Sequence, residues 1–117
     1  MKILVLGDVM GSSGRNALNK KLPQIIKNYA IDFVIVNGEN SADDGKGITQ
    51  EIAEEFFNIG VDVITSGNHI WDKQETTSYI DKENRLLRPA NLVEGSPGRG
   101  YETVSYTHLT LPTIYSV

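Results

Sequence analysis

Residues 67–72, Gly-Asn-His-Ile-Trp-Asp, follow directly on the apolar run Val-Asp-Val-Ile-Thr-Ser at 61–66. A short run rich in β-branched residues that stops at a glycine is typical of a buried strand. An amide, an imidazole and a carboxylate gathered immediately after such a strand exceed what a simple turn requires. We therefore interpret residues 67–72 as part of a functional site on a loop.

The same pattern occurs twice earlier in the chain. The apolar run at 2–6 leads into Gly7-Asp8, and the run at 33–36 leads into Asn-Gly-Glu-Asn at 37–40. In an open α/β sheet, ligands bind outside the carboxyl ends of the strands, where the connecting loops gather. Three such ends predict a site that contains Asp8, Glu39, Asn40, Asn68 and His69.

The segments between these strand ends have helical periodicity. Residues 13–29 are predicted to form a helix that Ser12 or Ser13 caps and that Pro23 kinks. The strand before it, 2–6, is almost continuously apolar, which predicts burial on both faces.

A second strand is expected at 32–36 and a third at 61–64, with a helix between them that Thr49 caps and Gly60 ends. Asp72 followed by Glu75 resembles a capping box and predicts a short third helix near Lys73. For Asp72 we favour this capping role over a contact with His69.

The order strand, helix, strand, helix, strand, helix (βαβαβα) predicts an α/β fold with a parallel sheet and right-handed crossovers. Beyond residue 85 the pattern weakens. We expect a short strand at 86–92 interrupted by its proline, a loop at 94–100 and a further strand at 101–104. Residues 105–117, rich in Thr, Ser and Tyr, do not continue the alternation.

Composition limits the function classes. The 117-residue chain contains no cysteine, so a metal must be held by oxygen and imidazole nitrogen. A net charge of −4 without a basic cluster predicts no stable nucleic-acid partner. No apolar stretch has membrane-spanning length and no secretory signal precedes the first strand, so we expect a cytoplasmic protein without a membrane partner.

The clustered side chains suit metal-assisted phosphodiester hydrolysis. Asp8 and Glu39 are hard oxygen donors, and the amide oxygens of Asn40 and Asn68 can join them. Two divalent ions beside two carboxylates leave a local positive surplus that suits an anionic phosphodiester. Glu39 can bridge both ions, a bridging hydroxide can attack phosphorus, and His69 can protonate the departing oxygen.

Each residue also has a plain structural interpretation when considered alone. Asp8 could form an Asx-turn, Glu39 and Asn40 could be solvated loop residues, and His69 could be a hydrogen-bonded turn residue. Their coincidence on three successive strand ends favours the metal site. A metal-free nucleotide-binding module is disfavoured because the dinucleotide glycine fingerprint is absent.

The Gly-Asn-His sequence at 67–69 resembles the signature of calcineurin-like metallophosphoesterases. The wider set of motifs resembles the YmdB-like branch of that superfamily, bacterial 2′,3′-cyclic-nucleotide phosphodiesterases, over roughly residues 1–104. The motifs occur in the order 7–11, 14–15, 37–40, 45–48, 67–72 and 87–91.

The resemblance implies a small-molecule phosphodiester substrate and an αββα sandwich, of which this chain is the N-terminal half. It also implies a centre of two metal ions, usually iron or manganese. By position, the resemblance assigns metal-ligand roles to Asp8, Glu39, Asn40 and Asn68, with Glu39 as the bridge, and a proton-donor role to His69.

The chain also departs from the family pattern. The remaining ligands of the family are histidines in its second half, and the only other histidine here, His108, matches neither of those motifs. We therefore expect residues 1–104 to be the N-terminal part of a metallophosphoesterase domain. We expect residues 105–117 to be an atypical, non-native tail. The alternative function is a truncated, catalytically incomplete fragment that binds at most one metal weakly and self-associates through an uncovered sheet.

Overall fold

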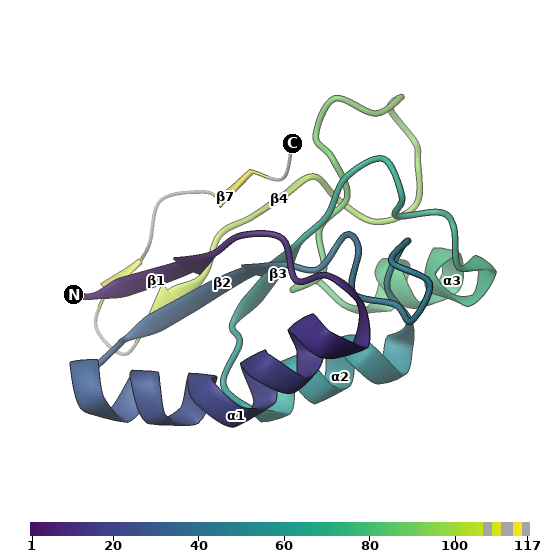
Figure 1. Ribbon diagram of the computed structural model, residues 1–117. Coiled ribbons are helices and arrows are strands. Elements are labelled where there is room, and N and C mark those ends of the chain that lie inside the picture. The colour runs from purple at the N-terminus through teal and green to yellow at the C-terminus, as the bar shows by residue number, and fades with distance from the viewer. Residues whose placement is uncertain (107–108, 111–113, 116–117) are drawn as a thin grey trace.

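The computed structural model describes residues 1–106, 109–110 and 114–115. Its centre is a parallel sheet of three strands in the order β1-β2-β3, comprising Ile3–Leu6, Phe33–Asn37 and Val63–Thr65. Figure 1 shows these strands running in one direction. The predicted α/β class and parallel sheet are confirmed.

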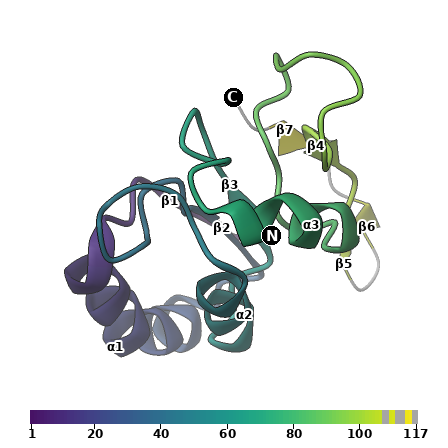
Figure 2. The same ribbon diagram turned by 90° about the vertical axis from the view of Figure 1, so that its right-hand side faces the viewer.

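Three helices alternate with the strands: α1 (Gly11–Tyr29), α2 (Gln50–Asn58) and α3 (Gln74–Lys82). The helices α1 and α2 cover one face of the sheet, and α3 lies beside α2 towards the ends of the strands (Figures 1 and 2). The order βαβαβα is therefore as predicted. Because each crossover returns the chain to the same end of the sheet, all three strands release their loops at one edge.

The helix-covered face of the sheet carries the main core. Leu4, Leu6, Val34, Val36 and Ile64 alternate towards this face and pack in one cluster with the apolar sides of α1 and α2. Val36 and Ile64 are fully buried, as is Leu22 of α1. Each such side chain contributes about 1.5–3 kcal/mol when removed from water, so this face holds the strands in register.

The predicted start and end of α2 are confirmed. The Thr49 hydroxyl accepts a hydrogen bond from the Ile52 amide at 3.2 Å, which satisfies one of the free N–H groups of the first turn. The chain leaves the helix through Gly60 at φ +114°, a conformation that residues with a Cβ rarely adopt.

The predicted cap of α1 is wrong. Its N-cap is Met10, without a side-chain hydrogen bond, and Ser12 and Ser13 lie inside the first turn. The reason is tertiary, because the Gly11 amide donates to the Asn40 carbonyl oxygen at 2.9 Å and so starts the helix against the neighbouring loop. The helix continues through Pro23, and the kink expected there stays a prediction.

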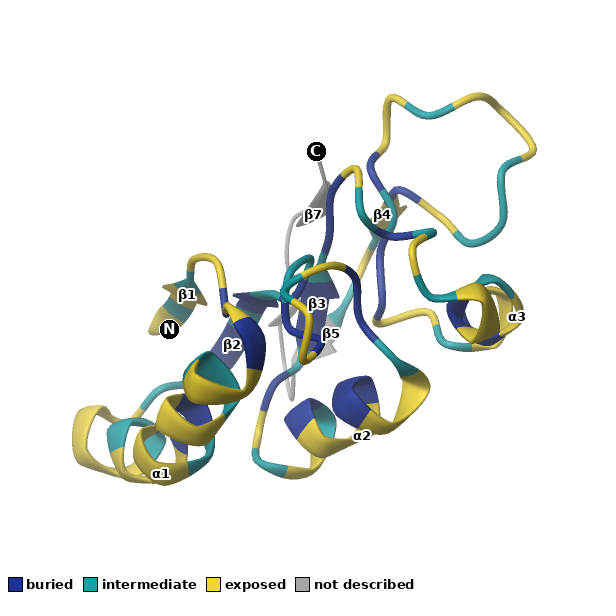
Figure 3. Ribbon diagram, turned by 45° about the vertical axis from the view of Figure 1, so that its right-hand side comes forward, coloured by how far each residue is buried: buried dark blue, intermediate teal, exposed yellow. Residues whose placement is uncertain are grey.

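The expected burial of the first strand on both faces is also wrong. Ile3 and Val5 of β1 are 46% and 66% exposed, whereas β2 and β3 are mostly buried (Figure 3). On this second face Leu87 and Val104 pack against Phe33, Ile35 and Val63 of β2 and β3. The strand β1 is at the edge of the sheet, beyond the reach of that cover.

The C-terminal region is only partly as expected. The strand expected at 86–92 is reduced to a single parallel β-bridge between Leu86 and Ile64. The strand predicted at 101–104 is shortened to β4 (Tyr101–Glu102). Short antiparallel pairs follow, in which β4 pairs with β7 (Ile114–Tyr115) and β5 (Ser105–Tyr106) pairs with β6 (Leu109–Thr110). His108 lies outside the described residues. In the part of the chain that the structure describes, no helix combines the length and apolarity that crossing a membrane requires.

Candidate functional site

Backbone hydrogen bonds join the three loops that follow the strands. The Val9 amide donates to the Asn37 carbonyl oxygen at 3.1 Å, and the Gly38 amide donates to the Thr65 carbonyl oxygen at 2.9 Å. The first bond ties the loop after β1 to the end of β2, and the second ties the loop after β2 to the end of β3. The loops that start at Gly7, Gly38 and Gly67 therefore open at one edge of one sheet, as the sequence predicted.

Asp8 and Asn40 face each other across the first two loops. The Asn40 amide nitrogen donates to Oδ1 of Asp8 at 3.0 Å. This bond orients the side-chain amide so that Oδ1 of Asn40 and Oδ2 of Asp8 remain available. Asp8 is exposed and Asn40 is half-buried, so both can be reached by an ion from solvent.

Glu39 packs directly on the glycine that precedes Asn68. A Cβ built on Gly67 would lie 1.9 Å from Oε1 and 2.3 Å from Cδ of Glu39. Only the absence of a side chain at residue 67 allows this close approach of the carboxylate to the third loop. Glu39 and Asn68 thereby line one pocket of about 280 Å³, whose other walls are Gly67, Pro89, Asn91 and Leu92.

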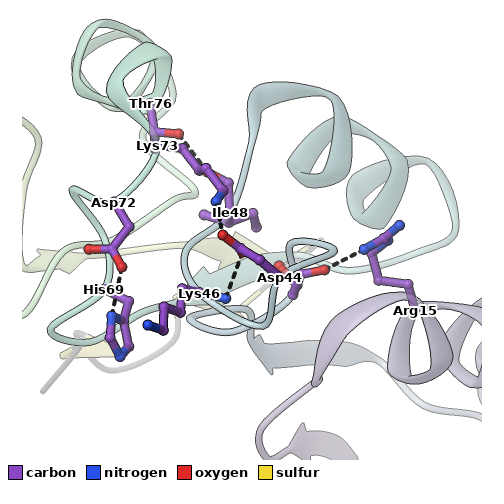
Figure 4. Close-up of polar contacts among 9 residues, drawn as sticks. Arg15, Asp44, Lys46, Ile48, His69, Asp72, Lys73 and Thr76 are labelled. Carbon is purple, nitrogen blue, oxygen red and sulfur yellow. Dashed lines mark hydrogen bonds and ion pairs between the residues drawn. The ribbon is translucent and has the colours of Figure 1, made fainter.

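His69 is paired with Asp72. The distance from Nδ1 of His69 to Oδ2 of Asp72 is 2.8 Å, and the two side chains are 32% and 35% exposed (Figure 4). A carboxylate at this distance holds a proton on Nδ1 and leaves Nε2 free for another partner.

The preferred role of Asp72 as a helix cap is therefore wrong. The cap residue of α3 is Lys73, without a side-chain hydrogen bond. Two successive turns, closed by the Ile70 amide on the Gly67 carbonyl oxygen and the Asp72 amide on the His69 carbonyl oxygen, fold Asp72 back towards the imidazole. The contact with His69 is thus set by the local turn geometry.

The segment after Asn40, residues 41–48, is held from two helices, and we call it the braced loop. Arg15 of α1 donates to the Ser41 carbonyl oxygen at 2.6 Å and to Oδ1 of Asp43 at 2.7 Å. From the other side, Lys73 donates to Oδ2 of Asp44 at 2.7 Å. The Thr76 hydroxyl of α3 donates to the Ile48 carbonyl oxygen (Figure 4). These contacts fix the loop that presents Glu39 and Asn40.

The ion pair with Lys73 also lowers the pKa of Asp44 in the braced loop. The Lys73 hydrogen bond, with a smaller contribution from the Lys46 amide, lowers the pKa of Asp44 below its ordinary value of 3.8. Asp44 is nevertheless well exposed, so solvent screens much of the attraction. The pair serves mainly to orient the loop.

The donors that the structure gathers suit a hard divalent cation, because they are carboxylate and amide oxygens. They lie as two pairs, Asp8 with Asn40 and Glu39 with Asn68, of which only the second lines the pocket. His69 is absent from that lining and turns to Asp72. Among the described residues, no three His, Asp or Glu side chains converge on a common point. These side chains therefore provide fewer ligands than two enclosed metal ions require.

Asn91 is the residue that sequence reasoning left out of the site. It belongs to the 87–91 motif, and it lines the pocket together with Glu39 and Asn68. The motif itself was the available signal, but an isolated loop asparagine has no periodicity that indicates a pocket.

Comparison with known proteins places the chain in a family. The family model described as YmdB-like protein matches residues 4–115. The chain is 47% identical, over 86% of its length, to the 2′,3′-cyclic-nucleotide 2′-phosphodiesterase of Bacillus subtilis. It is 39% identical, over 79% of its length, to a putative phosphatase/phosphodiesterase of Mycoplasma pneumoniae. The chain belongs to the YmdB-like family.

Solved structures agree with this assignment. A hypothetical protein from Thermus thermophilus superposes with a TM-score of 0.85 at 35% identity, over 94% of this chain and 42% of that one. A novel phosphatase from Mycoplasma pneumoniae superposes with a TM-score of 0.85 at 32% identity, over 94% and 40% respectively. The chain spans 38% and 32% of the two curated relatives. Its fold is that of the N-terminal half of a metallophosphoesterase.

Proposed function

We propose that this chain is the part of a metal-dependent phosphodiesterase that carries half of its metal site, and that the substrate is a 2′,3′-cyclic nucleotide or a related phosphodiester. The observation that carries the proposal is the Glu39 carboxylate seated on Gly67 beside Asn68, where three strand ends meet. The name of the Bacillus subtilis relative supports the substrate class.

The metal-binding roles are part of the same proposal. In the complete protein, Asp8, Glu39, Asn40 and Asn68 would supply part of the ligands of two divalent ions, iron or manganese, with Glu39 as the bridging residue. Such ions, when bound, neutralise phosphate charge and lower the pKa of coordinated water. The chain itself contributes a rigid frame, because Glu39 and Asn40 directly precede the braced loop and Asn68 lies in the loop that follows β3.

His69 would move the proton in the reaction. Asp72 holds Nδ1 of the imidazole at 2.8 Å, so Nε2 is the nitrogen that can deliver a proton to the leaving oxygen. Asp72 also fixes the orientation of the imidazole ring, as a carboxylate does in other acid–base pairs. In this arrangement Asp72 is a positioning residue for His69.

Metal binding is the first test. Titration of the 117-residue chain with Mn²⁺ by calorimetry should give a binding event that Glu39→Gln weakens by at least about tenfold, because one of two carboxylate charges is lost. Glu94→Gln, a change of the same kind at an exposed loop residue away from the pocket, is the matched control. Equal Mn²⁺ affinity of Glu39→Gln and the unmodified chain would refute the proposed site.

The proton-donor role is tested by kinetics in a protein that contains this segment and turns over 2′,3′-cyclic nucleotides. His69→Ala should reduce kcat by roughly two to four decades while metal content is preserved, since a general acid contributes about 10²–10⁴-fold. Metal analysis of the purified variant distinguishes a proton donor from a metal ligand. A loss of bound metal would reassign His69 as a ligand.

A second candidate function is a catalytically incomplete segment that binds at most one ion weakly. Two observations favour it: within the described ranges no three acidic or histidine side chains converge, and Ile3 and Val5 leave an apolar strip exposed on β1. Elemental analysis distinguishes the candidates, because two metals per chain with measurable hydrolysis would exclude this one.

The exposed strip also predicts homo-oligomers or aggregation in isolation. A monodisperse monomer in sedimentation would contradict this expectation.

We also propose, from the sequence, a cytoplasmic location and a boundary between residues 104 and 105 that separates the metallophosphoesterase segment from the atypical tail.

A further inference from the structure

The loop of residues 88–92 forms a wall of the pocket that Glu39 and Asn68 also line. Pro89, Asn91 and Leu92 line it. Pro89 is buried and Leu92 packs against the main core, whereas Asn91 between them is exposed. The two apolar residues thus hold the loop, and the polar one is presented to the pocket.

This wall is tied to β3, the strand that precedes the loop of Asn68. The Leu87 amide donates to the Ile64 carbonyl oxygen at 2.9 Å, and the Ser66 hydroxyl of the β3 end donates to the Leu87 carbonyl oxygen. On its other side the Arg88 amide donates to the Arg99 carbonyl oxygen at 3.0 Å. Asn91 is therefore held at a set position relative to Asn68, as a binding residue must be.

Three polar side chains around the pocket have no hydrogen-bond partner within the described residues: the Glu39 carboxylate and the amides of Asn68 and Asn91. The first two belong to the proposed metal site. The Arg88 guanidinium does not line the pocket: its NH1 donates to the Pro89 carbonyl oxygen at 2.9 Å, and its Nε is buried without a partner among the described residues. Asn91 thus contributes an unpaired side-chain donor to the pocket that the metal-binding side chains also line.

We propose that the Asn91 amide nitrogen donates a hydrogen bond to a phosphoryl oxygen of the substrate, and that Asn91 is a substrate-positioning residue rather than a metal ligand. This inference rests on the proposed function. A neutral amide suits the position, because it can bind an anionic phosphodiester next to the Glu39 carboxylate without competing for the cations.

Nuclear magnetic resonance of the ¹⁵N-labelled 117-residue chain separates the two proposals. Mn²⁺ should broaden the resonances of Gly67 and Asn68, which tests the metal site alone. With diamagnetic Mg²⁺ present, 2′,3′-cyclic AMP should shift the side-chain amide resonances of Asn91, which tests the inference.

The variant Asn91→Ala should bind 2′,3′-cyclic AMP roughly 10- to 100-fold more weakly, the effect of losing a hydrogen bond to a charged group. Its Mn²⁺ affinity should stay within about twofold of that of the unmodified chain, because the proposed metal ligands are unchanged. The matched control is Asn84→Ala, also an exposed loop asparagine, which should change neither affinity.

Three results would overturn the inference. Unchanged nucleotide affinity in Asn91→Ala would remove the hydrogen bond, and a loss of Mn²⁺ affinity in that variant would make Asn91 a metal ligand. Mn²⁺ that fails to broaden Gly67 and Asn68 in the unmodified chain would refute the proposed function and this inference with it.

Discussion

The braced loop and the pocket beside it use their polar side chains in opposite ways. In the braced loop, Asp43 and Asp44 each have a cationic partner, and the Ile48 carbonyl oxygen accepts from a buried hydroxyl. In the pocket, by contrast, the side chains of Glu39 and Asn68 have no hydrogen-bond partner among the described residues. The two regions belong to the same edge of the sheet.

This difference in hydrogen bonding distinguishes polar side chains that stabilise the fold from polar side chains that are available to bind a ligand. A buried polar group with a partner stabilises the native state, and leaving it unpaired is costly. A side chain that remains unpaired at a pocket gains nothing from folding, and its removal is often neutral or stabilising. Variants in the braced loop should therefore affect the free energy of unfolding, whereas variants in the pocket should affect ligand binding.

The largest expected effect on stability is that of Thr76→Val. The Thr76 side chain is fully buried and donates to the Ile48 carbonyl oxygen, so the substitution leaves a buried acceptor unpaired. We expect a loss of about 1–3 kcal/mol in the free energy of unfolding, measured by urea denaturation. Thr77→Val, the same change at the half-buried neighbouring residue, is the control. Equal stabilities of the two variants would contradict the bracing role.

A smaller, pH-dependent effect is expected at Asp44. Lys73 lowers the pKa of Asp44 in the folded state below the ordinary value of 3.8. The pair therefore contributes stability above that value, and the contribution is lost as the pH falls through the lowered folded-state pKa.

Urea unfolding of Asp44→Asn and the unmodified chain should show a small difference near pH 7 that disappears as the pH falls through the lowered folded-state pKa of Asp44. A double-mutant cycle with Lys73→Met isolates the pair. A difference that persists at the lowest pH would assign the effect to something other than the ion pair.

The smallest effect on stability is expected for Asn68→Ala in the pocket. Its exposed side chain makes no hydrogen bond within the described ranges, so the free energy of unfolding should change by less than about 0.5 kcal/mol. The same variant should bind Mn²⁺ more weakly in calorimetry. A stability loss as large as that of Thr76→Val would remove the contrast between the two regions.

Much of the fold follows from local patterns. The Thr49 cap and the Gly60 terminus depend on neighbours in the sequence and were predicted correctly, and the C-terminal ends of the three strands were predicted to within one residue. The shared edge also follows, because parallel strands joined by helices must release their loops on the same side.

The errors arose where the partner of a residue is distant or where two local roles compete. Met10 caps α1 because the Gly11 amide bonds to Asn40, a contact no capping rule includes. Asp72 satisfied a capping pattern and a turn pattern at once, and the turn prevailed because it brings the carboxylate to His69. The exposure of β1 depends on how far Leu87 and Val104 extend over the sheet.

The amino-acid sequence alone determined the alternation of strands and helices, and with it the edge at which Asp8, Glu39 and Asn68 emerge, because periodicity and chain handedness are local properties. Only the tertiary structure decided that Glu39 rests on Gly67 and that Asn91 joins the same pocket. Those contacts depend on the close approach of loops that are far apart along the chain, and packing rather than propensity sets that approach.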